Sequence, residues 1–356
     1  MPYDWYHDQT IYKLERERIF KREWLYAAHT AEIPEAGDFV TTELAGYPVL
    51  ILRDASGEIR AFYNICRHRA APLLTKDCGC MEAKMITCRY HGWSYSQSGC
   101  LVGAPMLEGL TESTRAELSL ATIHVAVHRG LIFINLAQDP LPFSEHFGQL
   151  IAAMDSDNSP LEAYSFHSKV TREGSFNWKV WIEGYQECYH CVTIHPIFKR
   201  DFLIGKYKVE NYDRFSRHSC QRKAQSESGQ FDGLWLWVYP NLCFPCYEHC
   251  FYTLQVIPLS ANRTRLTYTF HFRNRSQQKA VTEFIQFVDR ITDEDVSICE
   301  AVQNNLESDA LSSGFLNPAR ENGVVYFHSM VREALFGSKM IPGIGQQKGL
   351  AVTQPL

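Results

Sequence analysis

The sequence predicts an α+β protein in which a strand-rich unit precedes a unit of strands and long helices. Between residues 36 and 138, short runs of β-branched and aromatic residues alternate with turn signals, which is typical of antiparallel strands. Later in the chain, residues 277–308 repeat apolar side chains at helical spacing. The chain has 356 residues, more than one compact core usually holds, so we expect two domains.

Composition narrows the class of protein. Hydrophobic residues make up 45% of the chain and charged residues 21%, which is ordinary globular usage and argues against disorder or a coiled coil. The formal net charge of -5 offers no surplus of Lys and Arg for phosphate contacts, so we expect no nucleic-acid partner. No apolar run approaches the ~20 residues that cross a bilayer, and no signal or transit pattern opens the chain. We therefore expect a cytoplasmic protein with no membrane partner.

The N-terminal segment, residues 1–35, predicts a helix that packs on the second domain. Over residues 11–24, apolar side chains recur at helical spacing among charged ones. The apolar positions are Ile11, Leu14, Ile19 and Phe20. One face of a surface helix should therefore be covered.

Residues 36–138 predict a small all-β domain. The expected strands cover residues 39–44, 48–53, 59–63, 85–88, 93–95, 123–127 and 131–136. Turn signals such as Ala45-Gly46 and Ser98-Gly99 separate them, as in hairpins.

Residues 139–356 predict a domain of mixed structure. Pro140 and Pro142 punctuate its beginning. The expected elements are a helix over 176–194, strands over 207–215, 234–238, 251–257 and 264–272, and a long helix over 277–308. Strands followed by a long helix favour an α+β arrangement.

Two Cys-His pairs stand in the all-β domain. Cys66 and His68 form a CxH pair, and Cys88 and His91 form a CxxH pair, each at or just after a strand end. Two thiolates and two imidazoles suit either tetrahedral zinc or a [2Fe-2S] cluster with mixed ligands. Zinc fingers usually group both Cys in one pair and both His in another. Here each loop supplies one of each, which favours the iron-sulfur cluster over zinc.

These runs, NICRHRAAPL and ITCRYHGWSY, closely resemble the Rieske motif of the Rieske non-heme iron oxygenases. The resemblance implies that Cys66 and Cys88 bind one iron of the cluster and that His68 and His91 bind the other. This sequence also departs from the family's common form in two respects. The interval between His68 and Cys88 is longer, and Ala70 stands where glycine is usual.

Other polar residues flank this motif. Arg67, Arg69 and Arg89 suit loop salt bridges, tuning of the cluster, or attraction of an acidic redox partner. Cys78, Cys80 and Cys100 lie nearby in sequence. We interpret these three as buried, reduced thiols and not as ligands of a second cluster.

A second constellation lies within residues 177–196. Its candidate ligands are Glu183, Glu187, His190 and His195. His190 and His195 are five residues apart and diverge by about 140° on an ideal helix, so the helix must distort or end there. Pro196 favours that ending, because the residue before proline avoids helical geometry. Two histidines and a distant carboxylate would form the facial triad of a non-heme Fe(II) site; core or surface histidines are the alternative.

The string NWK followed by ECYHCVTIHP resembles the catalytic-domain signature of the same oxygenases. The resemblance implies a helix-grip-like catalytic domain with an antiparallel sheet and C-terminal helices, in which His190 and His195 bind iron. The family's third ligand is an aspartate on a C-terminal helix, which corresponds to the run TDEDVSICEAVQNNLES. We assign Asp295, with Asp293 as the alternative.

Glu187 stands where the family usually has aspartate, at the position that carries electrons from the cluster of a neighbouring subunit to the iron. In having glutamate at this position, the sequence resembles the branch of the family that acts on choline, carnitine, glycine betaine and stachydrine. The family assembles as head-to-tail trimers. The resemblance therefore implies a homotrimer in which Glu187 is the electron bridge.

The implied activity is that of the terminal oxygenase component of a two-component monooxygenase. It would use O₂ to hydroxylate or oxidatively N-dealkylate a quaternary ammonium or N-methyl substrate. No flavin or nicotinamide motif is visible, so NAD(P)H would act only through a separate flavin and iron-sulfur reductase. Two alternatives stay open: an aromatic ring-hydroxylating oxygenase, and a Rieske electron-transfer protein with a degenerate catalytic domain.

Aromatic residues in the run FDGLWLWVYPNLCF are candidates for a cage around a quaternary ammonium. Trp235, Trp237 and Tyr239 alternate along a predicted strand, and Phe231 and Phe244 are further candidates. The same pattern also suits a strand face that packs on the long helix.

Three cysteines follow this run together with His249. Cys243, Cys246 and Cys250 could suggest zinc, but we interpret them as buried thiols. Apart from the two cluster ligands, all cysteines are expected to be reduced and buried.

Overall fold

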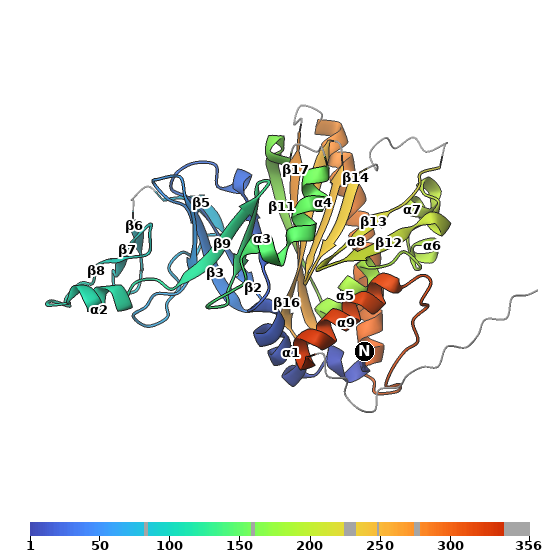
Figure 1. Ribbon diagram of the computed structural model, residues 1–356, viewed down its shortest axis with the longest axis horizontal. Helices are drawn as coiled ribbons and strands as arrows, with labels where there is room; N and C mark the ends of the chain where they lie inside the picture. The colour runs from blue at the N-terminus through green and yellow to red at the C-terminus, as the bar shows by residue number, and fades with distance from the viewer. Residues whose placement is uncertain (82–84, 158–160, 224–232, 248, 274–277, 338–356) are drawn as a thin grey trace, which may run out of the picture.

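The computed structural model describes residues 1–81, 85–157, 161–223, 233–247, 249–273 and 278–337. Within these residues the chain forms two seven-stranded antiparallel sheets and a small three-stranded sheet. Figure 1 shows the three sheets along the long axis of the molecule, with the smallest at one end and the helices of the second domain at the other.

The first large sheet has the strand order β1-β10-β9-β4-β3-β2-β5. Its strands are β1 (Leu25–His29), β2 (Asp38–Leu44), β3 (Tyr47–Arg53), β4 (Ile59–Tyr63), β5 (Cys78–Cys80), β9 (Thr122–His128) and β10 (Leu131–Asn135). The expected strands are confirmed, and β1 and β5 are additions; β1 lies within the segment 1–35, for which the sequence predicts a helix. Because β1 pairs with β10, the predicted boundary after residue 35 falls inside this sheet.

The three-stranded sheet extends from the same domain. It consists of β6 (Met85–Thr87), β7 (Ser94–Ser96) and β8 (Leu101–Gly103), followed by the short helix α2 (Glu112–Glu117). Figure 1 places these elements at the end of the molecule furthest from α6.

The second large sheet has the order β11-β17-β16-β15-β14-β13-β12. Its strands are β11 (Ser165–Gly174), β12 (Lys208–Tyr212), β13 (Phe215–Ser219), β14 (Gly233–Val238), β15 (Leu242–Tyr247), β16 (Cys250–Ser260) and β17 (Arg263–Phe272). The single strand predicted over 207–215 is wrong. It is the first strand of a hairpin, because Arg214 adopts a φ of +62° at the turn.

Helices surround this second sheet. They are α1 (Gln9–Glu15), α3 (Phe143–His146), α4 (Gly148–Ser156), α5 (Trp178–Tyr185), α6 (Cys191–Ile194), α7 (Pro196–Asp201), α8 (Gln278–Leu306) and α9 (Asn322–Phe336). The long helix predicted over 277–308 is confirmed by α8, and residue 277 itself lies outside the described residues. The helix predicted over 176–194 is two helices, α5 and α6, with an irregular segment between them.

The two faces of the second sheet belong to different cores. On β14, Trp235 and Trp237 face α5, α8 and α9, whereas Leu234 and Leu236 face the first domain. Tyr26 of β1 belongs to that second core. The two domains therefore share a buried interface, and the face with the helices is left to build a pocket.

The N-terminal segment packs on the second domain as expected. After α1 the chain continues as a π-helical turn, Arg16–Phe20, whose Ile19 and Phe20 are buried. The Arg18 guanidinium donates to the backbone carbonyl of Leu335 at the end of α9. The segment thus closes one end of the helical layer.

Candidate metal centres and active-site pocket

The four predicted cluster ligands come from two neighbouring loops. Cys66 and His68 follow β4, and Cys88 and His91 lie between β6 and β7. Both cysteines are buried, whereas both histidines are exposed. An inner pair of thiols and an outer pair of imidazoles is the donor arrangement that a mixed-ligand [2Fe-2S] cluster requires.

Contacts between the loops bring these side chains together. The Nδ1 atoms of His68 and His91 lie 3.1 Å apart. His68 stacks on Trp93, with ring centroids 4.9 Å apart and an interplanar angle of 6°. The Tyr95 hydroxyl lies 3.3 Å from the Cys66 Sγ. The residues present therefore fit the cluster that the sequence predicts.

The loop after Cys66 contains one strained residue. The Cys66 N–H donates to the Ala71 carbonyl at 2.8 Å, which closes a tight turn. Ala70 lies within this turn with a φ of +57°. Left-handed backbone costs about 1 kcal/mol for a residue with a Cβ, and glycine avoids that cost. The unusual Ala70 therefore keeps the conformation of a glycine position.

The second constellation is placed by two helix boundaries. Asn177 caps α5, with its side chain accepting a hydrogen bond from the Lys179 N–H at 3.0 Å. His190 lies at the N-cap of α6, and His195 lies between α6 and α7 with a φ of -112° and a ψ of 82°. Pro196 begins α7. The predicted break before Pro196 is confirmed, and it turns His195 back toward His190.

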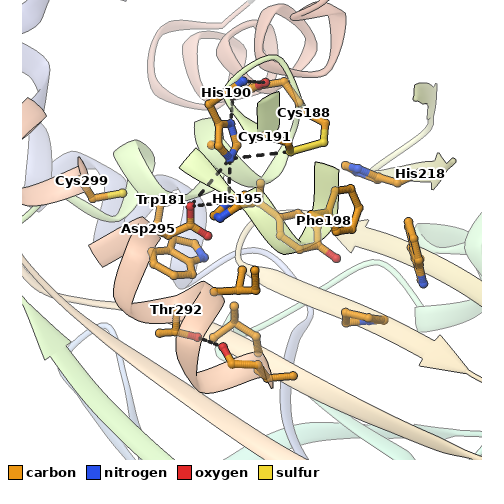
Figure 2. Close-up of a pocket in the computed structure, with 18 of the residues that line it drawn as sticks. Trp181, Cys188, His190, Cys191, His195, Phe198, His218, Thr292, Asp295 and Cys299 are labelled. Atoms are coloured by element: carbon orange, nitrogen blue, oxygen red, sulfur yellow. Dashed lines mark hydrogen bonds and ion pairs between the residues drawn. A yellow bond between two sulfur atoms is a disulfide. The ribbon is translucent and has the colours of Figure 1, made fainter. Parts of the chain in front are cut away.

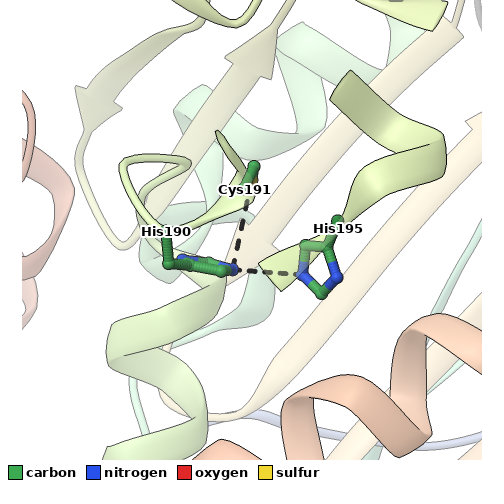
Figure 3. Close-up of side chains that lie close together, drawn as sticks. All are labelled: His190, Cys191 and His195. Atoms are coloured by element: carbon green, nitrogen blue, oxygen red, sulfur yellow. Dashed lines mark hydrogen bonds between the residues drawn. The ribbon is translucent and has the colours of Figure 1, made fainter. Parts of the chain in front are cut away.

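Figure 3 shows the two histidines with their rings directed toward one another. Their Nε2 atoms lie 3.2 Å apart. Asp295 of α8 completes the group, with its Oδ1 3.0 Å from Nε2 of His195 and 3.7 Å from Nε2 of His190. The structure therefore brings together the three side chains that the sequence pattern proposed as iron ligands.

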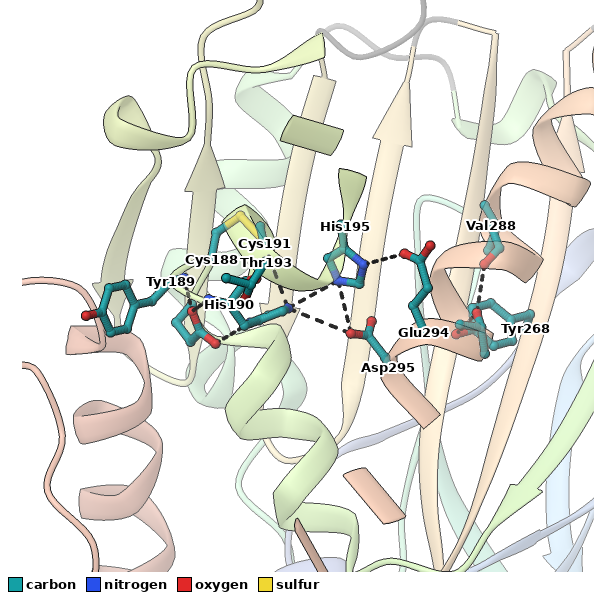
Figure 4. A network of polar contacts seen from close by, with 12 residues as sticks. Cys188, Tyr189, His190, Cys191, Thr193, His195, Tyr268, Val288, Glu294 and Asp295 are labelled. Atoms are coloured by element: carbon teal, nitrogen blue, oxygen red, sulfur yellow. Dashed lines mark hydrogen bonds and ion pairs between the residues drawn. A yellow bond between two sulfur atoms is a disulfide. The ribbon is translucent and has the colours of Figure 1, made fainter. Parts of the chain in front are cut away.

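A pair of carboxylates fixes the orientation of the imidazoles (Figure 4). Glu187 contacts Nδ1 of His190, and Glu294 contacts Nδ1 of His195 at 2.8 Å. These hydrogen bonds assign the ring protons to Nδ1 and leave the Nε2 lone pairs facing the Asp295 carboxylate. Three acceptors directed at one point repel each other unless a cation lies between them. The donor set, two nitrogens and one oxygen on one side, fits a non-heme iron.

The pKa of His195 reflects the same arrangement. Burial lowers it, and the hydrogen bonds and charges of Asp295 and Glu294 raise it by more, so the net direction is upward. A site that attracts a proton between an imidazole and a carboxylate also attracts a metal cation.

Asp293, the alternative third ligand, lies on a different face of α8. Its carboxylate pairs with Arg172 of β11, which also binds Asp289 at 3.2 Å. Asp293 is therefore directed to the sheet edge and Asp295 to the histidines.

The sequence reasoning did not identify Glu294. Its position next to Asp295 gives no direct signal, because adjacent residues of a helix do not share a face. The available signal was chemical: a histidine that binds a metal almost always donates its other N–H to an acceptor.

Several expectations about the cysteines are wrong. Cys188 and Cys191 form a disulfide on either side of His190, so these two are not reduced thiols. Their side chains come close because the irregular segment after α5 folds back on itself. Cys78, Cys80 and Cys100 are exposed and not buried, because β5 is an exposed edge strand and Cys100 lies in a turn.

The zinc interpretation of the later cysteines finds no support. Cys243, Cys246 and Cys250 are buried thiols, as expected. Cys243 and Cys246 belong to cores on opposite faces of the sheet. Thiols separated by a sheet cannot converge on one ion.

A cavity of about 340 Å³ opens beside His190, His195 and Asp295. Figure 2 shows these residues at one side of the cavity and His218 across from them. Its aromatic lining comes from helices α5, α7 and α8 and from the second sheet: Trp181, Tyr185, Phe198, Tyr207, Trp235, Tyr247, Tyr252, Tyr268 and Phe287. The polar groups of the described lining include the tyrosine hydroxyls, Thr292, the histidines and the carboxylates.

One residue of the predicted cage lines the cavity. Trp235 lines the cavity, whereas Trp237 packs against Phe327 of α9, with ring centroids 5.6 Å apart. Tyr239 packs against Trp237 outside the lining. Phe244 belongs to the core on the opposite sheet face. The twist of the sheet carries the later positions of β14 toward α9.

The remaining candidate, Phe231, lies outside the described residues. Most aromatic residues of the lining stand on elements far from that run in sequence, so no local pattern identified them.

One histidine of the lining is neutral. His218 contacts the Tyr207 hydroxyl through Nδ1 at 2.8 Å and the Gln186 Oε1 through Nε2 at 3.0 Å. Burial lowers the pKa of His218 to about 3. This side chain therefore adds no positive charge to the cavity at neutral pH.

Comparison with known families supports both centres. Residues 23–115 match the model of the Rieske [2Fe-2S] domain, and residues 161–337 match that of the ring hydroxylating alpha subunit, catalytic domain. The chain is 26% identical to the carnitine monooxygenase oxygenase subunit of Escherichia coli strain K12, over 94% of this chain and 93% of the relative. It is 28% identical to the chloroplastic choline monooxygenase of Amaranthus tricolor, over 94% of this chain and 77% of the relative.

Solved structures share the fold. A quaternary ammonium Rieske monooxygenase, CntA, superposes with a TM-score of 0.85 at 24% identity, covering 94% of each chain. Naphthalene 1,2-dioxygenase from Rhodococcus sp. superposes with a TM-score of 0.78 at 18% identity, covering 95% of each chain. Both therefore share the fold of this chain over nearly its whole length.

Proposed function

The chain belongs to the Rieske non-heme iron oxygenases, and from this we propose that it oxidises a quaternary ammonium or related N-methyl compound as the oxygenase component of a two-component monooxygenase. The relatives named for carnitine and choline support this substrate class. The observation that carries the proposal is the aromatic cavity beside His190, His195 and Asp295. Aromatic faces are the preferred surroundings of a quaternary ammonium, which has no N–H to donate.

Two groups of residues would hold the cofactors. Cys66, His68, Cys88 and His91 would hold the [2Fe-2S] cluster, and His190, His195 and Asp295 would hold the iron. When bound, these centres supply electron transfer and the activation of O₂. The protein provides the geometry around them.

The chain's own residues orient the iron ligands and shape the pocket. Glu187 accepts a hydrogen bond from the Nδ1–H of His190, and Glu294 accepts one from the Nδ1–H of His195. Each carboxylate thereby fixes the orientation of one imidazole ring. We propose that Glu187 also connects His190 with a neighbouring subunit, a role supported by the contact of its carboxylate with Nδ1 of His190 and by the exposed Tyr189 two residues further on. The aromatic lining would hold the substrate and exclude water from the reacting bond.

The electron supply requires other polypeptides. Figure 1 shows the sheet of β6, β7 and β8, whose first loop contains His91, at one end of the molecule and α6, which begins after His190, at the other. A homotrimer would place one subunit's cluster beside the next subunit's iron. A separate flavin and iron-sulfur reductase, fed by NAD(P)H, would reduce the cluster.

The location of the protein is part of the same proposal. Among the described residues, every helix is too short or too polar to cross a bilayer. Apart from the Cys188–Cys191 disulfide, ten cysteines carry thiols, three of them exposed, and we propose the cytoplasm because it is the compartment that keeps exposed thiols reduced.

Oxygen uptake tests the proposed activity. Purified protein, loaded with both metal centres and supplied with a surrogate reductase, should consume O₂ when a trimethylammonium compound is added. His195→Ala should abolish this uptake while the cluster keeps its absorption spectrum. Loss of the cluster in this variant would contradict the assignment of ligands, and uptake with only aromatic hydrocarbons would contradict the substrate class.

A further inference from the structure

We propose that the substrate is a cation that carries no carboxylate, a narrower class than the trimethylammonium compounds as a whole. This inference rests on the proposed function and concerns the same cavity. The relatives' names include one substrate with a carboxylate, carnitine, and one without, choline. The chemistry of the lining distinguishes the two.

The described lining of the cavity contains no Lys and no Arg. A carboxylate taken from water into an apolar pocket needs a paired cation or several N–H donors, because an unpaired buried charge is costly. His218 is neutral, since burial lowers its pKa to about 3. The cavity therefore offers an anion no side-chain charge to pair with.

The charge of bound iron does not supply the missing partner. Asp295 offsets one of the two positive charges of the metal, and the carboxylates of Glu187 and Glu294 lie one imidazole further out. Glu183 also lines the cavity and lies 2.9 Å from Nε2 of His328. The surroundings of the iron are thus dominated by carboxylates, which attract a cation.

The aromatic lining provides the matching surface. The ring of Trp235 meets that of Tyr247 at 70°, with centroids 6.1 Å apart, and so forms two walls of a corner. Tyr252 and Tyr268 stand nearby in the same lining, with centroids 5.8 Å apart. Ring faces attract cations and do not attract carboxylates.

Two further donors are out of reach of a ligand. The indole N–H groups of Trp181 and Trp235 are buried and have no hydrogen-bond partner among the residues that the structure describes. Because neighbouring atoms cover them, these residues present ring surface to the cavity. They cannot replace a guanidinium as a carboxylate receptor.

One cationic side chain lies in a neighbouring cavity. This smaller cavity shares Cys188 and Tyr207 with the first and is lined by Arg320. The Arg320 guanidinium donates to the Gly205 carbonyl at 3.4 Å. If a substrate carboxylate extended that far, Arg320 would bind it, so this residue provides a direct control.

Binding to matched ligand pairs tests the inference. Isothermal titration of the metal-loaded protein, without O₂ or reductant, compares choline with glycine betaine and butyltrimethylammonium with γ-butyrobetaine. We expect each cation to bind at least tenfold more tightly than its zwitterionic partner. The neutral choline analogue 3,3-dimethylbutan-1-ol should also bind at least tenfold more weakly than choline.

The outcomes separate this inference from the proposed function. Equal or tighter binding of the zwitterions, with turnover, would overturn the inference and leave the proposed function intact. Binding of zwitterions that is lost in Arg320→Ala would overturn it in the same way and identify the receptor. Failure of every trimethylammonium compound to bind would overturn the proposed function itself.

Two variants sharpen the test. Val302 lines the cavity and is 39% exposed, so Val302→Arg places a guanidinium at the rim and should tighten zwitterion binding at least tenfold. Val302→Gln is its uncharged control. Trp235→Leu should weaken choline binding about tenfold, whereas Phe244→Leu, on the opposite face of the sheet, should not. Equal effects of the last two would argue against the cage.

Discussion

At the scale of single residues, the proposed iron site depends on which ring nitrogens carry protons as much as on the distances between its side chains. His190 and His195 each give one ring N–H to a carboxylate, and each turns its other nitrogen to the point that Asp295 also faces. Replacing any one of the five groups changes a charge or a lone pair at that point. The consequences differ between a residue that faces the metal and one that stands behind it.

Asp295 and Asp293 provide the first comparison. We expect Asp295→Asn to lose most of the mononuclear iron and at least about 100-fold in turnover, because the amide removes a negative ligand. Asp293→Asn should keep its iron, since that carboxylate pairs with Arg172 instead. Metal analysis of both purified variants, with the cluster's absorbance as the internal reference, checks this. Equal iron loss in both variants would contradict the choice of Asp295.

Glu187 and Glu294 provide the second comparison. In the Glu187→Gln variant both metal sites should stay filled. Oxidation of the reduced cluster in a single turnover should be slower, because the amide weakens the link to the neighbouring subunit. Glu294→Leu, which leaves no acceptor behind His195, should instead weaken iron binding by about 10- to 100-fold, the usual effect of removing an acceptor behind a histidine ligand. Stopped-flow spectroscopy of the cluster and iron titration separate these effects. Rapid cluster oxidation in Glu187→Gln would argue against a bridge.

At the scale of elements, the beginning of α5 is held by a buried ion pair. The Lys179 ammonium lies 2.6 Å from Glu15 of α1 and donates to the Trp5 carbonyl at 3.0 Å. The Trp178 indole donates to the same Glu15 carboxylate at 2.8 Å. Burial lowers the pKa of Lys179, and Glu15 opposes that change. The NWK string therefore ties the N-terminal segment to the helix that precedes the iron ligands.

We expect Lys179→Met to destabilise the protein by about 3 to 5 kcal/mol, because it leaves the buried Glu15 carboxylate without its cationic partner and with only the neutral Trp178 indole as donor. Lys179→Met combined with Glu15→Gln should recover much of that loss. The exposed pair Lys21 and Glu17 is the control, and Lys21→Met should cost no more than about 1 kcal/mol. Urea unfolding of the four proteins measures the differences. A small effect of the single Lys179 variant would show that the pair contributes little.

At the scale of the whole molecule, the two domains meet around a buried histidine. His29 ends β1 of the first sheet and contacts Phe251 and His271 of the second, with ring centroids 5.5 and 4.5 Å apart. Its Nδ1 accepts the Ala31 N–H at 3.1 Å. Gly130 packs so closely that a Cβ there would lie 2.4 Å from Nε2 of His29. The interface therefore encloses a neutral imidazole.

Acid should weaken this interface. Burial lowers the pKa of His29 to about 4, below the ordinary value of 6.5, so the unfolded chain takes up a proton before the folded one. The contribution of His29 to the free energy of unfolding is then fully present above about pH 6.5. It falls by about 3 kcal/mol as the pH drops toward 4. His29→Asn keeps the acceptor and does not titrate. Unfolding midpoints between pH 7 and 4 should fall less in this variant; parallel curves would contradict the assignment.

The sequence was most informative where ligands are close together in the chain. The CxH and CxxH pairs identified the cluster residues, and the five-residue interval before Pro196 indicated the helix break that the structure contains. It was least informative for partners that only folding brings together. Glu294 and most of the aromatic lining stand on other elements than the histidines, and the disulfide depends on a turn that no pattern predicted.

From the sequence alone came the family, the two kinds of metal centre and a prediction of their main ligands, because ligand type and spacing are local properties. Three things depend on the tertiary structure: the position of Asp295, and not Asp293, beside the histidines, the wall of rings around the cavity, and the absence of Lys and Arg from its described lining. The reason is geometric. Which side of a helix or strand faces a site depends on the packing of distant segments, and the charge of a pocket is set by everything that surrounds it.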